Sequence, residues 1–261
     1  ETVDNLANQK KVNYSLNGKL SKAEFVKELV TDLPVPPTYF PSNVKLNREG
    51  YLGIDEIMTK SFKKLTPDYV NHKIKSKDVV ILDTRKSFKY CNEHIPGSIF
   101  IGLDGRFAPW VGEIIRDINQ EIILIVEKDR AEEAIRRLSR VGFDNCIGYL
   151  DGDLKSWKSS GYSTESIRSI SPEQFVKESH QNSQIIDVRE KIELSKGKFQ
   201  SSINVPLSKI DSNIKLDKNV NSYIYCAGGY RSVIACSIIK KNGLKKAVNI
   251  ETGFSGIRNL I

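Results

Sequence analysis

One cysteine of the chain lies in a segment whose residue types suit nucleophilic chemistry. The segment reads Cys226-Ala-Gly-Gly-Tyr-Arg231-Ser232, after an aromatic and β-branched stretch (223–225) and before apolar residues at near-helical spacing (233–239). This order predicts a buried strand, a glycine-containing loop and a helical segment that begins at Ser232. Unpaired amides and the positive end of the helix dipole meet at such a loop and favour a thiolate. We therefore predict that Cys226 is a nucleophile.

The residues after the cysteine are predicted to bind the substrate. Gly228 and Gly229 allow backbone dihedrals that are closed to other residues. Arg231 adds a permanent charge and a flat fork of donors, which suits an anion. Ser232 would either donate one more bond to the anion or cap the helix. The predicted substrate-binding residues are Ala227, Gly228, Gly229, Tyr230, Arg231 and Ser232.

The other cysteines and the histidines indicate no second site. Cys236 lies among apolar residues in the middle of the helical segment and is expected in the core, whereas Cys91 is expected to be a partly exposed bystander. The four cysteines lack the close paired spacing of a zinc site or a disulfide framework. The histidines are too far apart in sequence to form a helix-spaced ligand pair, so no metal site is predicted: His72, His94 and His180.

The chain contains two copies of one pattern, separated by roughly 100 residues, which is far longer than a solenoid repeat. Val79–Arg85 and Gln184–Arg189 are both continuous apolar runs that end in Asp-x-Arg. A proline-started helix precedes each run, after Thr66 and after Ser171. Strands alternate with helical stretches in each copy, which predicts an α/β fold with a mostly parallel sheet. Ligands bind beyond the carboxyl ends of such strands, where Cys226 is expected to lie.

Two residues at the end of the second Asp-x-Arg run are predicted to support the site. Asp187 is expected to accept hydrogen bonds from backbone amides of a nearby loop. Arg189 would either pair with a carboxylate at the surface or stand at the rim of the site as a charge for an incoming anion.

The first 50 residues differ from the rest in composition and are predicted to form an irregular arm. One helix is expected from Ser21 to Val30, with Ser21 and Glu24 in a capping box. The proline-rich stretch Leu33–Pro41 is predicted to be extended. The expected organisation is an arm over residues 1–50, a first α/β domain over 51–163 and a second over 164–261.

With these motifs identified, the chain resembles tandem members of the rhodanese family. The resemblance rests on Asp-Val-Arg-Glu (187–190) and Cys-x-x-Gly-x-Arg-Ser (226–232) in the second copy. The first copy supplies the other half of the family signature, in Leu82–Arg85, Glu93–Ser98, Gly152 and Trp157. It implies two rhodanese-like domains, each a mostly parallel sheet flanked by helices.

The two copies depart from the family pattern in different ways. The first has neither cysteine nor glycine between Val126 and Ala134, and the place of the nucleophile falls near Ile125 to Glu127. We therefore expect the first domain to be inactive and the second to be active. In the second copy, Lys198–Ser202 replaces the usual His-Ile-Pro-Gly-Ala, and Phe254–Ile257 lacks the usual tryptophan, so the local geometry is expected to differ there.

The resemblance implies a sulfurtransferase. Cys226 would take a sulfane sulfur from thiosulfate or a low-molecular-weight persulfide and pass it to a thiol or to cyanide. One alternative is a cysteine phosphatase, but those enzymes place five residues between cysteine and arginine, and this loop has four. Another is a module that accepts sulfur from a partner domain without turnover.

Four stretches before residue 52 resemble the tail of a metallo-β-lactamase-fold persulfide dioxygenase that is fused to rhodanese domains. They are Asn8–Leu16, Phe25–Leu29, Leu33–Pro41 and Leu46–Tyr51. This resemblance implies an upstream iron-binding dioxygenase domain as a partner in cis, and no cofactor in this chain. The chain opens on Glu1 rather than Met, as expected of a fragment of a longer protein.

Composition excludes several classes of function. The 261 residues carry a net charge of +8, but the lysines are scattered, so nucleic-acid binding is not expected. No run of 18 apolar residues predicts a membrane span, and no signal segment opens the chain. Four cysteines without paired spacing suit a reducing compartment, so a cytoplasmic location is expected. Homo-oligomer formation is left open.

Overall fold

The computed structural model describes residues 3–16, 18–31, 36–37, 39–76, 78–179, 182–211 and 214–260. The chain divides into two compact units, residues 1–37 and residues 38–261. The second unit therefore begins inside the stretch that was predicted as the arm. It contains both sheet-bearing domains.

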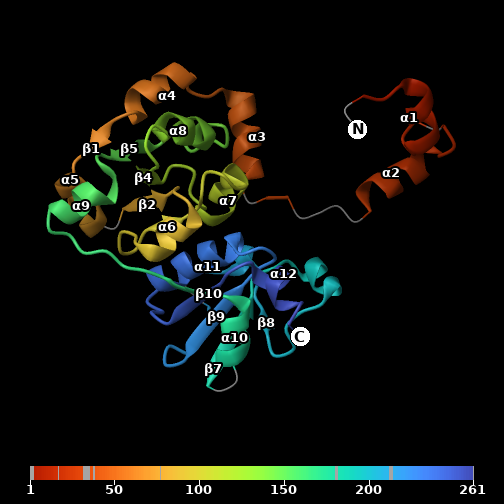
Figure 1. Cartoon of the computed structure of the whole chain (residues 1–261). Coiled ribbons are helices and arrows are strands. Elements are labelled where there is room, and N and C mark those ends of the chain that lie inside the picture. Colours follow the sequence, from red (N-terminus) through yellow and green to blue (C-terminus); the bar gives the residue numbers. More distant parts are fainter. Residues whose placement is uncertain are drawn as a thin grey trace. The chain divides into compact units, whose positions relative to one another are not determined.

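The first unit holds two short helices, α1 (Leu6–Val12) and α2 (Lys22–Val30) (Figure 1). The Ser21 hydroxyl accepts a hydrogen bond from the Glu24 amide at 3.3 Å, and the Glu24 carboxylate accepts one from the Ser21 amide at 2.8 Å. This reciprocal pair confirms the predicted capping box and the predicted helix. Neither helix contains a buried residue, so the apolar side chains of this unit do not form a core among the described residues.

The proline-rich stretch is only partly described, because residues 32–35 and 38 lie outside the described residues. At its end the predicted extended conformation is wrong, since α3 (Phe40–Glu49) begins there. Pro41 fits the first turn because an amide at that position has no intrahelical acceptor to lose. A Cβ atom at Gly112 would lie 2.2 Å from the Tyr39 ring, so the entry to α3 packs closely against the first domain.

The first domain is built on a parallel five-stranded sheet with the order β1-β5-β4-β2-β3. Its strands are β1 (Lys64–Leu65), β2 (Val79–Asp83), β3 (Ile99–Phe100), β4 (Glu121–Ile125) and β5 (Cys146–Leu150). After α3, its helices are α4 (Ile54–Ser61), α5 (Pro67–Ser76), α6 (Ser87–Asn92), α7 (Phe107–Ile114), α8 (Ala131–Ser139) and α9 (Asp153–Ser159).

The second domain repeats this arrangement, with the parallel strand order β6-β10-β9-β7-β8. Its strands are β6 (Arg168–Ile170), β7 (Ser183–Asp187), β8 (Ile203–Asn204), β9 (Asn221–Tyr225) and β10 (Ala247–Ile250). Its helices are α10 (Pro172–Glu178), α11 (Tyr230–Lys241) and α12 (Gly253–Ile257), with two 3₁₀ helices, η1 (Lys191–Lys196) and η2 (Leu207–Lys209). The matching orders confirm the predicted duplication and the predicted α/β class.

Alternation along the strands decides which face each side chain covers. In β2, Val80 and Leu82 join one buried cluster, while Val79 and Ile81 join another on the opposite face. The same period of two applies at β9, where Tyr223 and Tyr225 face a cluster of the second domain alone. Ile224 and Cys226 point the other way, into the cluster that both domains share. The pleat of β9 thus directs Cys226 toward the first domain.

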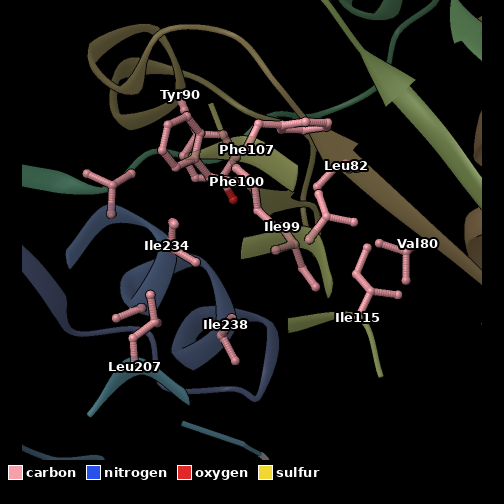
Figure 2. Close-up of a cluster of buried hydrophobic side chains, with 14 of the residues drawn as sticks. Val80, Leu82, Tyr90, Ile99, Phe100, Phe107, Ile115, Leu207, Ile234 and Ile238 are labelled. Atoms are coloured by element: carbon pink, nitrogen blue, oxygen red, sulfur yellow. The ribbon is translucent and has the colours of Figure 1, made fainter. Parts of the chain in front are cut away.

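The shared cluster joins the two domains through apolar contacts (Figure 2). Leu82, Phe100 and Phe107 of the first domain belong to it together with Ile234 and Ile238 of α11. A polar contact fixes the register of this interface, because the Phe100 amide donates to the Ser237 hydroxyl at 3.1 Å. Burial of this continuous apolar surface stabilises one arrangement of the domains, so residues from both can build one site.

Candidate active site

Cys226 follows β9 at its carboxyl end, as predicted. Its Sγ accepts a hydrogen bond from the Gly229 amide at 3.1 Å and lies 3.7 Å from the Ser232 hydroxyl. Only 1% of the residue is exposed, yet it lines a pocket of about 480 Å³ that both domains enclose. A thiol in this position is sheltered from bulk water but open to a small molecule in the pocket.

The loop after Cys226 turns through one left-handed residue. Gly229 has φ +91°, and a Cβ atom there would lie 3.0 Å from the Thr252 amide nitrogen. Gly228 does not have a positive φ, and a Cβ atom there would meet nothing within 4 Å. The prediction that both glycines need special dihedrals is therefore wrong for Gly228, because the whole reversal occurs at Gly229.

Helix α11 begins at Tyr230, two residues before the predicted start at Ser232. The earlier start brings the amides of Tyr230, Arg231 and Ser232 into the first turn, where no intrahelical acceptor exists. Among the described residues, no backbone or side-chain group accepts a hydrogen bond from these three amides. They are uncommitted donors in the turn that directly follows Gly229, whose own amide binds the sulfur, and such amides stabilise an anion at a helix N-terminus.

Ser232 lies inside the first turn rather than at the cap. Its hydroxyl donates to the Gly229 carbonyl at 3.1 Å, and α11 has no side-chain cap. The predicted alternative in which Ser232 caps the helix is therefore wrong. The hydroxyl remains 3.7 Å from the Cys226 Sγ, where it can contribute to the polar surroundings of the sulfur.

A second glycine, Gly253, packs directly against the backbone of the Cys226 loop. At Gly253, with φ +54°, a Cβ atom would lie 2.2 Å from the Cys226 carbonyl oxygen. The next residue, Phe254, donates its amide to that carbonyl at 2.7 Å. The start of α12 thus fixes the backbone of Cys226 through a contact that only glycine permits.

Arg231 projects into the pocket but is already engaged. Its Nη1 and Nη2 each lie 2.6 Å from a carboxylate oxygen of Glu193, which is carried by η1. The bidentate contact with Glu193 raises the pKa of Arg231, and it lowers the pKa of Glu193 in return. The pair is therefore fully ionised at neutral pH.

Asp187 and Arg189 form a buried pair behind the loop. The guanidinium of Arg189 donates to both carboxylate oxygens of Asp187 at 2.6 to 3.0 Å, and the Arg189 amide also donates to that carboxylate at 3.0 Å. Arg189 is 2% exposed and lies over the Phe254 ring at 4.2 Å. Arg189 therefore pairs with a carboxylate, as one alternative predicted, but the pair is buried rather than at the surface, and the other alternative, a rim charge, is wrong. Asp187 accepts a backbone amide, as predicted of a supporting residue.

The first domain preserves this pair without the nucleophile. Arg85 donates to both oxygens of Asp83 at 2.7 to 3.1 Å, and both residues are buried. Asp83 pairs with Ile125 in the sheet, as Asp187 pairs with Tyr225, so Val126 occupies the position of Cys226. A valine cannot act as a nucleophile, and the place falls within the predicted range of Ile125 to Glu127.

The first domain nevertheless forms one wall of the pocket. Arg106 and Trp110, at the start of α7, line it opposite the residues of η1 and the loop, namely Glu190, Ile192, Glu193, Cys226, Gly228, Tyr230 and Arg231. Sequence reasoning missed Arg106, Trp110 and Glu193. No local motif marks them, because the packing of the domains brings the first two to the site and the path of η1 brings the third.

The remaining cysteines are buried in the cores. Cys91 is 4% exposed, so its predicted partial exposure is wrong, since α6 packs it inside the shared cluster. Burial raises the pKa of Cys91 to about 12 and that of Cys146 to about 12, and it also raises the pKa of Cys236. Such thiols are protonated and inert at neutral pH.

The described residues contain no group of three or more His, Cys, Asp or Glu side chains that is arranged to hold a metal ion. His180 lies outside the described residues. None of the described helices is both long and apolar enough to span a bilayer.

Comparison with known proteins identifies the family. The model of the rhodanese-like domain matches twice, over residues 66–160 and 171–260. Protein YrkF of Bacillus subtilis (strain 168) is 33% identical over 102 residues, and the match covers 38% of this chain and 55% of that protein. A tRNA uridine(34) hydroxylase of Prochlorococcus marinus (strain MIT 9312) is 31% identical over 85 residues, which cover 28% of this chain and 27% of the relative. The chain thus spans about half or less of the length of these two curated relatives.

Solved structures of two proteins are also similar to parts of this chain. A rhodanese-like domain protein from Staphylococcus aureus is 31% identical, with a TM-score of 0.33, and the match covers 35% of this chain and 91% of that one. A thiosulfate sulfurtransferase from Pseudomonas aeruginosa is 17% identical, with a TM-score of 0.36, over 76% of this chain and 42% of that one. Since the two family-model matches cover most of the chain, and each contains four of the five strands of one sheet, the chain belongs to the rhodanese-like family as a tandem of two domains.

Proposed function

We propose that the chain is a sulfurtransferase that carries sulfane sulfur on Cys226. The observation that supports this most directly is the position of the Cys226 Sγ, at the base of a pocket and 3.1 Å from the Gly229 amide. Uncommitted amides of the first turn of α11 lie beside it, and such donors stabilise developing negative charge. The proposed substrate-binding residues are Ala227 to Ser232, with Asp187 and Arg189 as supporting residues.

The reaction is proposed to proceed by two displacements. The Cys226 thiolate attacks the outer sulfur of thiosulfate or of a low-molecular-weight persulfide, and a bond forms between Sγ and that sulfur. The sulfur–sulfur bond of the donor breaks, and its electron pair leaves with sulfite or with the thiolate of the donor. A second thiolate, or cyanide, then attacks the outer sulfur of the Cys226 persulfide and releases the Cys226 thiolate. No external oxidant or reductant is needed.

The supporting pair has a positional role in this proposal. Asp187 and Arg189 are buried and do not line the pocket, so neither touches the substrate. Their pairing fixes the end of β7 beside β9, where the Val188 amide donates to the Tyr225 carbonyl at 2.9 Å. The residue before the nucleophile is thereby held in place.

We also propose that the chain acts within a larger sulfide-handling protein in the cytoplasm, in which the inactive domain spans residues 51–163 and the active one 164–261. The tail-like stretches of residues 1–50 favour an upstream dioxygenase domain in cis, which would supply persulfide and hold the iron. Exposed apolar side chains on α2 support the proposal that this unit packs against a partner. Val26, Leu29 and Val30 are each about half exposed, at 47%, 48% and 55%. In the alternative without turnover, Cys226 would only accept sulfur from that domain.

Intact-mass measurement tests the proposed reaction. The chain is incubated with thiosulfate or with a small persulfide, and then with or without cyanide. We expect the mass to rise by one sulfur atom at Cys226 and to return with cyanide. Cys226→Ser should show no gain, whereas Cys236→Ala, a change of a cysteine that lies inside α11 and away from the pocket, should behave like the parent chain.

Three outcomes separate the functions. Repeated thiocyanate formation supports turnover, and a single sulfur gain that cyanide does not release supports the accepting module. Hydrolysis of p-nitrophenyl phosphate that depends on Cys226, without any sulfur gain, would favour the phosphatase and overturn the proposal.

A further inference from the structure

The guanidinium of the predicted anion-binding arginine is not available to a substrate. Both terminal nitrogens of Arg231 face Glu193 at 2.6 Å, in the fork-to-fork geometry that arginine also uses for external anions. The Arg231 side chain is 18% exposed and that of Glu193 is 30% exposed. The carboxylate therefore occupies, from within the chain, the position that an anionic donor would take.

Glu193 is held in place by its own backbone segment. Its carboxylate accepts the Glu190 amide at 2.9 Å, and the two residues form a capping box at the start of η1. Because the carboxylate is oriented before it meets Arg231, little side-chain entropy is lost in the pair. A substrate must displace a preorganised group rather than a mobile one.

The other charges that line the pocket also disfavour an anionic donor. Arg231, Glu190 and Glu193 of the second domain line the pocket that contains Cys226, and Arg106 lines it from the first domain. With Arg231 neutralised by Glu193, the cation that remains is Arg106 of the first domain, which forms no ion pair among the described residues. An ionised Cys226 adds another negative charge at the base.

We propose that Glu193 is a specificity-determining residue that disfavours thiosulfate and leaves persulfides as the preferred donors. This inference rests on the proposed sulfurtransferase function. Thiosulfate is a dianion, and its reaction with the Cys226 thiolate gives the Cys226 persulfide anion and the sulfite dianion. A persulfide anion carries one charge and leaves as a thiolate, with the electron pair of the broken sulfur–sulfur bond. When a carboxylate occupies Arg231, the dianion loses more binding free energy than the monoanion does, because the Coulomb energy scales with charge.

The matched pair Glu193→Gln and Glu190→Gln tests this role. Both remove one negative charge from the same wall, and glutamine retains an oxygen that can accept a backbone amide, but only Glu193 touches Arg231. The donors are thiosulfate and 2-hydroxyethyl persulfide, which has no charge beyond its sulfur, with cyanide as the common acceptor. We expect Glu193→Gln to raise kcat/KM for thiosulfate by about tenfold, as one regained charge-assisted hydrogen bond would.

The rate with the persulfide should rise less, by about threefold, because a single negative charge gains half the interaction energy of a double one. Equal effects of the two substitutions, or no gain with thiosulfate in Glu193→Gln, would contradict the role of Glu193. A double-mutant cycle adds a sharper criterion: in an Arg231→Gln background, Glu193→Gln should no longer favour thiosulfate. A gain that persists there would show that the effect does not pass through Arg231.

The same measurements distinguish a failure of the proposed sulfurtransferase function from a failure of the proposed role of Glu193. If neither donor places sulfur on Cys226 in the parent chain or in Glu193→Gln, the sulfurtransferase assignment itself is wrong. If both donors do so and the donor preference is the same in all variants, only the role of Glu193 is overturned.

Discussion

The hydroxyl of Tyr230 donates a 2.8 Å hydrogen bond to the backbone carbonyl of Gly102, and this bond crosses from the second domain to the first. The Tyr230 ring also makes an edge contact with Phe100, with centroids 5.8 Å apart. Tyr230 is the first residue of α11, so the first domain holds the start of the helix that follows the Cys226 loop. We infer that its role in the tandem is positional.

Gly105→Ala tests this positional role. A Cβ atom at Gly105 would lie 2.5 Å from the Tyr230 ring, so the ring and the start of α11 must move. We expect a loss of about 1 to 3 kcal/mol in the free energy of unfolding, as overpacking usually costs, and a slower formation of the Cys226 persulfide. Gly53→Ala, where a Cβ atom meets nothing within 4 Å, is the control. Unchanged kinetics in Gly105→Ala would refute the coupling between the domains.

The two loop glycines give a second prediction, because they differ in conformation. Gly229→Ala forces a side chain into φ +91°, which costs about 1 to 3 kcal/mol, and it crowds Thr252. We expect the Gly229 amide to move away from the Cys226 Sγ and the single-turnover rate to fall. Gly228→Ala should change the rate much less, since its backbone is unstrained and the space is open. Stopped-flow measurement of persulfide formation compares the two, and similar rates in both variants would contradict the assignment of the turn to Gly229.

Much of this fold follows from local patterns in the sequence. The continuous apolar runs before Asp83 and Asp187 predicted central strands, because a parallel strand is buried on both faces. Ser21 and Glu24 predicted the start of α2, since a capping box depends only on residues three apart. The lack of a cysteine near Ile125 to Glu127 followed from the repeat, because β4 and β9 occupy the same place in the two sheets, but the exact residue did not.

The details of the site depend on contacts that no local pattern encodes. Glu193 and Arg231 are 38 residues apart in sequence, and the path of η1 brings them together. Arg106 and Trp110 reach the pocket only because Phe100 and Ile234 pack in one cluster across the domains. The exposure of Arg189 was misjudged for a related reason, since Phe254 from the far end of the domain covers it. The residues that line the pocket around Cys226 are therefore determined by tertiary packing. The candidate nucleophile, by contrast, can be predicted from the residues next to it in sequence.

The duplicated Asp-x-Arg pair gives a third prediction. Breaking a buried ion pair by removing one charge costs about 3 to 5 kcal/mol, because the other charge is left unpaired. We expect Asp187→Asn and Asp83→Asn to lower the free energy of unfolding to a similar extent, since both pairs are buried with the same geometry. Urea denaturation measures this quantity. If Asp187→Asn abolished sulfur transfer at unchanged stability, Asp187 would have a chemical role rather than a structural one.

The buried His94 predicts a pH dependence of stability that is separate from the chemistry of Cys226. Burial lowers the pKa of His94 to about 4, with its ring nitrogen Nδ1 2.8 Å from the Tyr90 carbonyl and its ring stacked on Tyr90. The nearby charges of Lys240 and Arg85 lower the pKa further, and Glu165 opposes them. In the unfolded chain an exposed histidine titrates near 6.5, so the unfolded state binds the proton first as the pH falls. The stability that the neutral ring provides is therefore complete above about pH 6.5 and is lost progressively toward pH 4.

Urea unfolding at pH 7 and at pH 5 measures this effect. We expect a loss of roughly 2 kcal/mol over that interval from His94 alone, by the linkage between proton binding and unfolding. His94→Phe keeps an aromatic ring against Tyr90 but cannot titrate, so its stability should change less with pH, whereas the exposed His72→Gln should retain the full dependence. Staying at or above pH 5 limits the contribution of carboxylates, most of which titrate lower. Parallel pH profiles for His94→Phe and the parent chain would show that this histidine is not the titrating group.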